Sequence, residues 1–146
     1  MARYGAGGRT GAGSTTLPIF SLYAAASYGG VIREIGVSNS TTTAVTLGVR
    51  RMTTAGTQGT AESEIPHDPA RPAAQCTAVN THSSTGPTLT AGWLAGPVVL
   101  GAAAGAGWVW TFGAEGLVIP TGTGNGIGVI PNGTGQACDV YILWDE

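Results

Sequence analysis

The sequence predicts an all-β fold, an antiparallel β-sandwich of jelly-roll type, from two observations. Short runs of β-branched and aromatic residues recur at intervals of roughly ten residues, with Gly, Pro, Asn and Ser between them. No stretch combines a helical repeat of apolar residues with capping residues. About seven to nine short strands in one domain-sized chain are typical of a two-layer sandwich or jelly roll.

The N-terminal residues differ in composition from the rest of the chain. Residues 1–16 are mostly Gly, Ala, Ser and Thr, which cannot form a core of their own. The sequence therefore predicts an extended arm over residues 1–16 and the sandwich over residues 17–146. Arg3, Tyr4 and Arg9 are residue types that anchor one protein surface on another, so we expect them to hold the arm against a partner. A flexible tail is the alternative.

The first strands follow the arm directly. A strand is expected at residues 17–26, at a sheet edge because Pro18 cannot donate to a ladder. The runs at 31–38 and 44–52 are predicted to pair as a hairpin across a polar connection. The apolar residues of these two runs are the predicted core: Ile35, Val37, Val45, Leu47 and Val49.

The second half of the chain contains the remaining strands. Residues 53–75, with three prolines and three acidic residues, predict an irregular surface excursion. Trp108, Trp110 and Phe112 are expected on one face of their strand, and the last strand is expected to be covered on both faces. The strands expected after the excursion lie within 76–84, 96–107, 108–113, 117–120, 127–131 and 138–146.

The glycine-rich stretch at 120–137 resembles a phosphate-binding loop only in composition. The dinucleotide-binding spacing places Ile127 where the third glycine should be, and the chain contains no Lys for a P-loop. A strand rather than a helix is predicted to follow, so no helix dipole faces an anion. We therefore expect turns, at Asn125-Gly126 and at Asn132-Gly133.

Charge is sparse: charged residues make up 10% of the chain, with six Arg, no Lys and eight acidic residues, for a net charge of −2. This balance gives no electrostatic reason to expect nucleic acid or an anionic membrane as a partner. No signal-peptide core or membrane-length apolar run occurs, so we expect synthesis in a cytoplasm. So little charge predicts that much of the surface is covered by other protein, most simply by oligomerisation.

No group of residues predicts catalysis, a cofactor or a metal. His67 and Asp68 are adjacent and point apart, and Cys76 with His82 supplies at most two members of a triad. We therefore predict no catalytic, cofactor-binding or metal-binding residues, and a protein that is not an enzyme. Cys76 and Cys138 could pair, although two buried thiols are favoured.

Charged residues that are close together in the sequence are predicted to have structural rather than catalytic roles. Glu62 and Glu64 resemble a glycosidase pair in chemical type alone, and their polar surroundings predict solvated charges. Arg50 and Arg51 are neighbours on one predicted strand and point to opposite faces. One of them is expected to meet Glu34 across the predicted hairpin.

Three stretches, residues 5–24, 32–60 and 111–146, resemble small virion-associated proteins of tailed bacteriophages, of the capsid decoration (cement) type. The resemblance covers most of the chain and is weakest in the proline-rich loop. It implies a jelly-roll sandwich, commonly trimeric, that is seated on the lattice of the major capsid protein. Such a family has no active-site motif, so no functional residue is carried over.

The leading hypothesis is a virion protein on the capsid surface, made in the host cytoplasm, that decorates and stabilises the head as a homotrimer. Its partners are itself and the major capsid protein, without a cofactor, nucleic acid or membrane. One alternative is a receptor- or carbohydrate-binding module of a tail fibre, with exposed Trp or Tyr stacked on sugars. Another is a trimeric jelly-roll ligand domain on a collagen-like stalk supplied by a partner, since this chain has no Gly-X-Y repeat.

Overall fold

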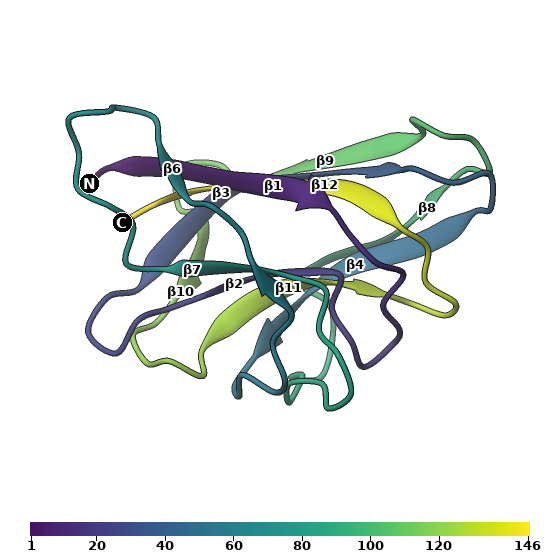
Figure 1. The fold of residues 1–146 in the computed structure, drawn as a ribbon, viewed down its shortest axis with the longest axis horizontal. Coiled ribbons are helices and arrows are strands. Elements are labelled where there is room, and N and C mark those ends of the chain that lie inside the picture. Colours follow the sequence, from purple (N-terminus) through teal and green to yellow (C-terminus); the bar gives the residue numbers. More distant parts are fainter.

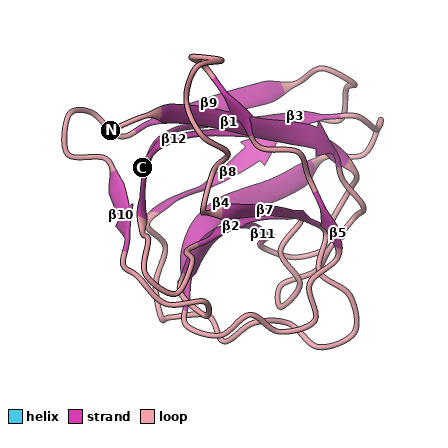
Figure 2. Cartoon of the chain, turned by 60° about the vertical axis from the view of Figure 1, so that its left-hand side comes forward, coloured by secondary structure: helices cyan, strands magenta, loops and turns pink.

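The computed structural model describes residues 1–146, and every regular element in it is a β-strand. Two six-stranded antiparallel sheets pack face to face, one above the other in Figure 1 and again in the turned view of Figure 2. The predicted all-β antiparallel sandwich is confirmed. No helix long and apolar enough to cross a bilayer is present.

Sheet I, whose strands β9, β3, β12, β1 and β6 lie uppermost in Figure 1, has the order β10-β3-β12-β1-β6, and β9 also pairs with β3. Its strand β10 is drawn lower, at the left of the figure. Its strands are β1 (Arg3–Arg9), β3 (Gly30–Asn39), β6 (Ile65–Pro66), β9 (Gly107–Thr111), β10 (Leu117–Ile119) and β12 (Cys138–Asp145).

The lower sheet, sheet II, has the order β5-β7-β2-β11-β4-β8. Its strands are β2 (Phe20–Tyr23), β4 (Val45–Met52), β5 (Thr60–Ala61), β7 (Thr77–Asn80), β8 (Ala95–Leu100) and β11 (Gly126–Pro131).

One core fills the space between the sheets. Alternate residues of the long strands point inward, as in β12, where Val140, Ile142 and Trp144 are buried and Asp139 and Tyr141 are exposed. The five residues that the sequence assigned to the core are all buried. The largest fully buried side chains include Phe20, Leu22, Ile32, Ile35, Leu47, Ile127 and Trp144.

The predicted N-terminal arm is wrong, because residues 3–9 form an interior strand of sheet I. Strand β1 pairs with β12 along its whole length and with β6 on its other side. Tyr4 and Ala6 point into the core, and the Tyr4 ring stacks on Trp144 with centroids 5.8 Å apart. Glycine and alanine suit this position because an interior strand needs backbone pairing on both sides and little side-chain volume on its outer face.

The predicted hairpin of residues 31–38 with 44–52 is also wrong. Strand β3 belongs to sheet I and β4 to sheet II, so the chain changes sheets between them. Buried Asn39 fixes this corner: its amide donates to the carbonyls of Thr43 and Gly101, and its oxygen accepts from Thr41 N. Both strands bury their apolar faces as expected, but against each other across the core rather than side by side.

Two further local predictions are wrong: the edge position of the strand within 17–26, and the turn at Asn125-Gly126. Strand β2 is interior, between β7 and β11, because Pro18 lies before the strand and removes no ladder donor. The glycine-rich stretch contains strand β11, so Gly126 lies in a ladder, where a Cβ would come 2.8 Å from the carbonyl of Leu22. Gly133 does occupy a turn, with φ of 124°.

Candidate functional site

The residues considered for acid–base or metal chemistry do not converge. His67 donates its backbone N–H to the carbonyl of Arg3, while Asp68 faces Arg71 at 3.5 Å on the surface. No group of three or more His, Cys, Asp and Glu side chains is placed to hold a metal ion. Both glutamates accept hydrogen bonds from β7 instead: Glu62 from the side-chain amide of Asn80, and Glu64 from the backbone N–H of Ala78.

His82 is buried within a structural cluster. Its Nε2 lies 2.9 Å from the Tyr23 hydroxyl and 3.1 Å from the carbonyl of Ala55, whereas its Nδ1 has no hydrogen-bond partner. Since a carbonyl only accepts, Nε2 carries the hydrogen. Burial lowers the pKa of His82 and raises that of Tyr23, so both stay neutral and tie the start of the 53–75 excursion to β2.

Both cysteines are free and buried, as favoured from the sequence. Cys138 lies at the start of β12 and Cys76 just before β7. Burial is the main cause that raises the pKa of both thiols, that of Cys138 to about 11. Neither is a thiolate at neutral pH, so neither is an activated nucleophile.

The three residues expected to anchor a partner serve the fold. Arg3 and Arg33 both pair with Asp145, at 2.8 and 2.7 Å, and hydrogen bonding to Arg3 is the main cause that lowers the pKa of this carboxyl. Arg9 pairs with Asp139 on the surface at 2.8 Å through two parallel hydrogen bonds. Tyr4 is only 2% exposed, so its anchoring role is wrong.

The pair predicted between Glu34 and either Arg50 or Arg51 does not form, because β3 and β4 lie in different sheets. The Arg50 guanidinium lies over the Trp93 ring, 5.3 Å from its centroid, and donates to the carbonyl of Thr90. Arg51 donates to the carbonyl of Val118. Glu34 instead accepts a hydrogen bond from the hydroxyl of Tyr141 at 2.6 Å.

One edge of the sandwich is covered by the 53–75 excursion, and we call it the closed edge. Within the excursion, the two-residue strand β5 ends sheet II beside β7, and the two-residue strand β6 ends sheet I beside β1. The Tyr4 hydroxyl donates to the carbonyl of Pro72, which fastens the excursion to the core. Very short strands, prolines and acidic side chains are the devices that keep a sheet edge from pairing with another chain.

The opposite edge, the open edge, consists of β8, β9 and the connection 101–106 between them. No Asp, Glu, Lys or Arg occurs between Arg71 and Glu115. Val99, Trp108 and Val109 are 70%, 50% and 51% exposed, and nearly all of the connection is exposed Gly and Ala. Pro97 and a register shift opposite β4 interrupt the first half of β8, but the rest of the edge has no such device.

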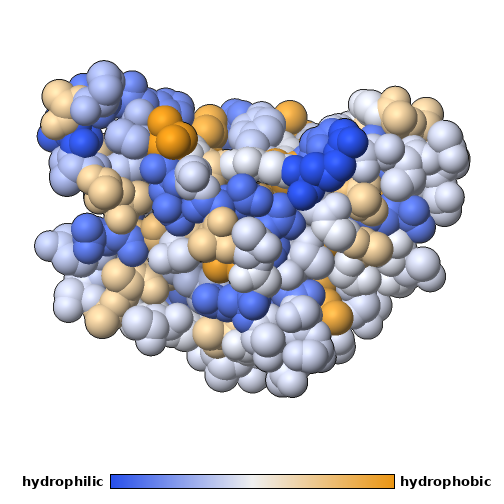
Figure 3. Space-filling view, viewed as in Figure 1, coloured by the Kyte–Doolittle hydropathy of each residue, from blue (hydrophilic) through white to orange (hydrophobic).

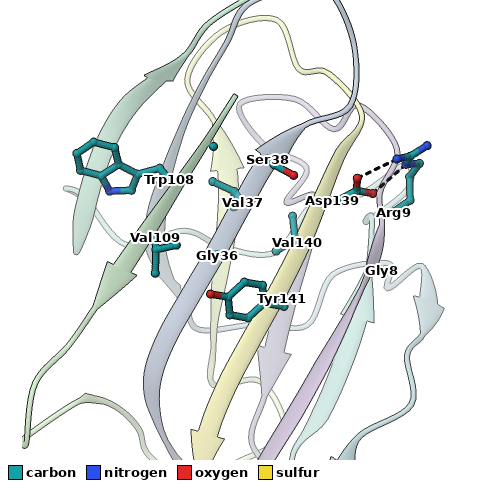
Figure 4. A pocket seen from close by; sticks show the side chains of 11 residues that line it. Gly8, Arg9, Gly36, Val37, Ser38, Trp108, Val109, Asp139, Val140 and Tyr141 are labelled. Carbon is teal, nitrogen blue, oxygen red and sulfur yellow. Dashed lines mark hydrogen bonds and ion pairs between the residues drawn. The ribbon is translucent and has the colours of Figure 1, made fainter. Parts of the chain in front are cut away.

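The outer face of sheet I carries a shallow depression of about 450 Å³, shown in Figure 4. Three glycines line it, Gly8, Gly36 and Gly107, so backbone forms much of its surface. Tyr141 and Val109 lie toward one end, and the bidentate Arg9–Asp139 pair lies at the other. The Trp108 indole turns away from Tyr141 in this view, toward the side of the sandwich core and the open edge.

The position of Tyr141 depends on the glycine opposite it. Tyr141 pairs with Gly36 on β3 and Gly7 on β1, and a Cβ at Gly36 would overlap the Tyr141 ring. The ring therefore lies over the β3 backbone, and the hydrogen bond to Glu34 fixes its hydroxyl. That hydrogen bond is also the main cause that raises the pKa of Tyr141.

Sequence reasoning missed Tyr141 because the last strand was expected to be covered on both faces. The alternation of Asp139 and Tyr141 with buried Val140 and Ile142 was a usable signal for an open outer face. The glycine beside Tyr141 carried no such signal, because the partner of a strand is not visible in the strand itself. Trp110 and Phe112, which the sequence predicted on one face of their strand, both pack on the core.

Comparison with known proteins identifies no relative: no family model, curated protein or solved structure matches this chain. The open edge and the outer face of sheet I are the two surfaces of this chain with features suited to binding.

Proposed function

We propose that this chain is a non-enzymatic virion protein of a tailed bacteriophage that decorates and stabilises the capsid surface. In this proposal it binds the lattice of the major capsid protein as a homotrimer. The observation that carries the proposal is the open edge, where β8, β9 and the connection 101–106 expose apolar surface without a single charge.

The chemistry of the open edge favours protein contact. Depletion of charged residues and enrichment in aromatic residues distinguish the centre of an interface from ordinary surface. Val99, Trp108 and Val109 expose large apolar side chains there, and an uncovered strand edge also offers unpaired backbone groups. A closed ring of three protomers requires each open edge to meet a different surface of the next copy.

The rest of the surface is compatible with wide, shallow contacts. Much of the face in Figure 3 is white or pale blue, the colours of weakly polar residues such as Gly, Ser and Thr, with blue and orange groups among them. Small side chains let two surfaces approach closely and lose little conformational entropy when they are covered. A protein that stabilises a shell needs this kind of area rather than a reactive group.

The jelly-roll type of the sandwich is part of the same proposal. The strand pairs are nested along the chain: β4 pairs with β8, β3 with β9 and β10, β2 with β11, and β1 with β12. Nested pairing is expected when one long antiparallel hairpin winds into two facing sheets. The nesting supports the jelly-roll assignment.

Binding to capsid shells tests the proposal. Shells assembled from the major capsid protein alone are mixed with the purified chain, sedimented, and imaged by electron microscopy. We expect the wild-type chain to sediment with the shells and to raise the temperature at which they break. Val99→Glu should bind much less, and Ile65→Glu, a change at a similarly exposed position of the closed edge, should bind as wild type. The proposal would be overturned if the shells did not bind the wild-type chain, or if they bound both variants equally.

A further inference from the structure

We infer that the depression on the outer face of sheet I binds a neutral pyranose ring of a glycan, stacked on Tyr141. This inference goes beyond capsid decoration and does not depend on it.

The Tyr141 ring is held in advance in a position suited to stacking. Gly36 leaves room for the ring against the sheet, and Glu34 fixes the hydroxyl at 2.6 Å. The residue is still 38% exposed, so part of the ring stays available to solvent. An immobilised aromatic ring loses little entropy on binding and offers an apolar face to the C–H groups of a sugar ring.

The glycines on this face leave backbone exposed at the depression. Glycine within a strand often marks a position where another group comes near the backbone. At Gly36 that group is the Tyr141 ring, and at Gly8 it is the Glu62 carboxylate. Together with Gly107, these glycines border one depression. Its volume of about 450 Å³ falls in the range of about 300–1,000 Å³ that is common for small-molecule sites.

Polar groups at the other end match sugar hydroxyls. Arg9 and Asp139 use two N–H donors and one acceptor site on each carboxylate oxygen for each other. The remaining N–H groups and oxygen lone pairs can donate to and accept from a diol. The Ser38 side chain lies next to Asp139 on the neighbouring strand and adds a hydroxyl that can donate or accept.

The same groups disfavour other ligands. The Arg9 charge is balanced by Asp139, and Glu34 adds a further carboxylate nearby, so a phosphate or a carboxylate ligand meets no net positive charge. An added β-strand is excluded because β3 and β12 are already paired on both sides. A purely apolar ligand would cover the ion pair without satisfying its remaining hydrogen-bonding groups.

Titration with defined sugars tests the inference. The probes are linear hexasaccharides of glucose, N-acetylglucosamine, mannose and galactose, added separately and followed by calorimetry. We expect at least one hexasaccharide to bind with a Kd of about 1 mM or tighter. Tyr141→Ala should weaken that binding at least about tenfold. Tyr28→Ala, which removes an exposed tyrosine outside the depression, should leave the Kd unchanged.

Two further variants keep the test decisive if Tyr141→Ala does not fold. Asp139→Asn changes an exposed side chain at the polar end and should weaken binding several-fold with an unchanged unfolding midpoint. Gly36→Ala retains every aromatic residue but displaces the Tyr141 ring, and should also weaken binding. If no hexasaccharide binds the wild-type chain, or if Tyr141→Ala and Asp139→Asn bind as wild type does, the site is not a sugar site.

Discussion

The two edges of this sandwich differ in how their strands are protected from pairing with another chain. At the closed edge, the 53–75 excursion places two-residue strands, prolines and the hydrogen-bonded Glu62 and Glu64 beside β1 and β7. At the open edge, β9 and the second half of β8 end their sheets with exposed apolar side chains and contain no charged residue themselves. An unprotected edge is an aggregation hazard for a protein that stays alone. The difference supports the proposal that the open edge makes a protein contact.

The largest expected effect is a difference in the unfolding free energy lost when an aromatic residue is removed from each edge. Tyr4→Ala removes a buried ring stacked on Trp144 and its hydrogen bond to Pro72, and should lower the free energy of unfolding by about 3–5 kcal/mol. Trp108→Ala removes a half-exposed ring at the open edge and should cost only about 1 kcal/mol. Urea denaturation in the Val99→Glu background, where the chain is expected to be monomeric, measures both. Equal losses would mean that the isolated chain relies on the open edge as much as on the closed one.

The next effect concerns Asp145, which joins β12 to Arg3 and Arg33. Asp145→Asn should cost about 2 kcal/mol at neutral pH, a moderate figure because Arg3 is partly exposed. The folded-state pKa is lowered, so this contribution is complete above about pH 4 and is lost as the pH falls through the folded value. Urea denaturation at pH 7 and pH 3 should show the gap between wild type and variant shrinking. In the control Asp68→Asn, on an exposed pair, no comparable gap should appear at pH 7.

The smallest effect is a pH dependence at the start of the excursion. Burial lowers the pKa of His82, so the unfolded chain takes up a proton at this residue before the folded chain does. Stability is therefore complete above about pH 6.5 and falls by about 1 kcal/mol as the pH drops to 5. His82→Gln should remove most of this dependence, while His67→Gln at the surface should retain it. A wild-type curve that is flat from pH 7 to 5 would contradict the account of His82.

The sequence was sufficient for the fold class because period-two alternation and turn residues are local signals. It was insufficient for residues 1–16 and for residues 101–106, which have similar Gly- and Ala-rich compositions. The first segment becomes an interior strand because Tyr4 and Ala6 alternate inward and β12 supplies a partner 130 or more positions away. The second stays exposed because no later segment covers it.

Pairing also explains why the candidate sites were only partly predictable. Low charge predicted an interface, and the stretch without charged residues between Arg71 and Glu115 supplies both strands of the open edge, β8 and β9, although it also contains β7. The depression beside Tyr141 depends on Gly36 lying opposite, which follows from the β3–β12 register and not from either strand alone. The predicted hairpin failed for the same reason, since both of its strands satisfy their alternation equally well in different sheets.

The mass of the purified protein in solution tests the central claim most directly, that copies of this chain cover the open edge. Sedimentation velocity over a range of concentrations should give a trimer for wild type and a monomer for Val99→Glu, while Ile65→Glu stays trimeric. A wild-type chain that remains monomeric at its highest soluble concentration, or a Val99→Glu variant with wild-type mass, would contradict the account.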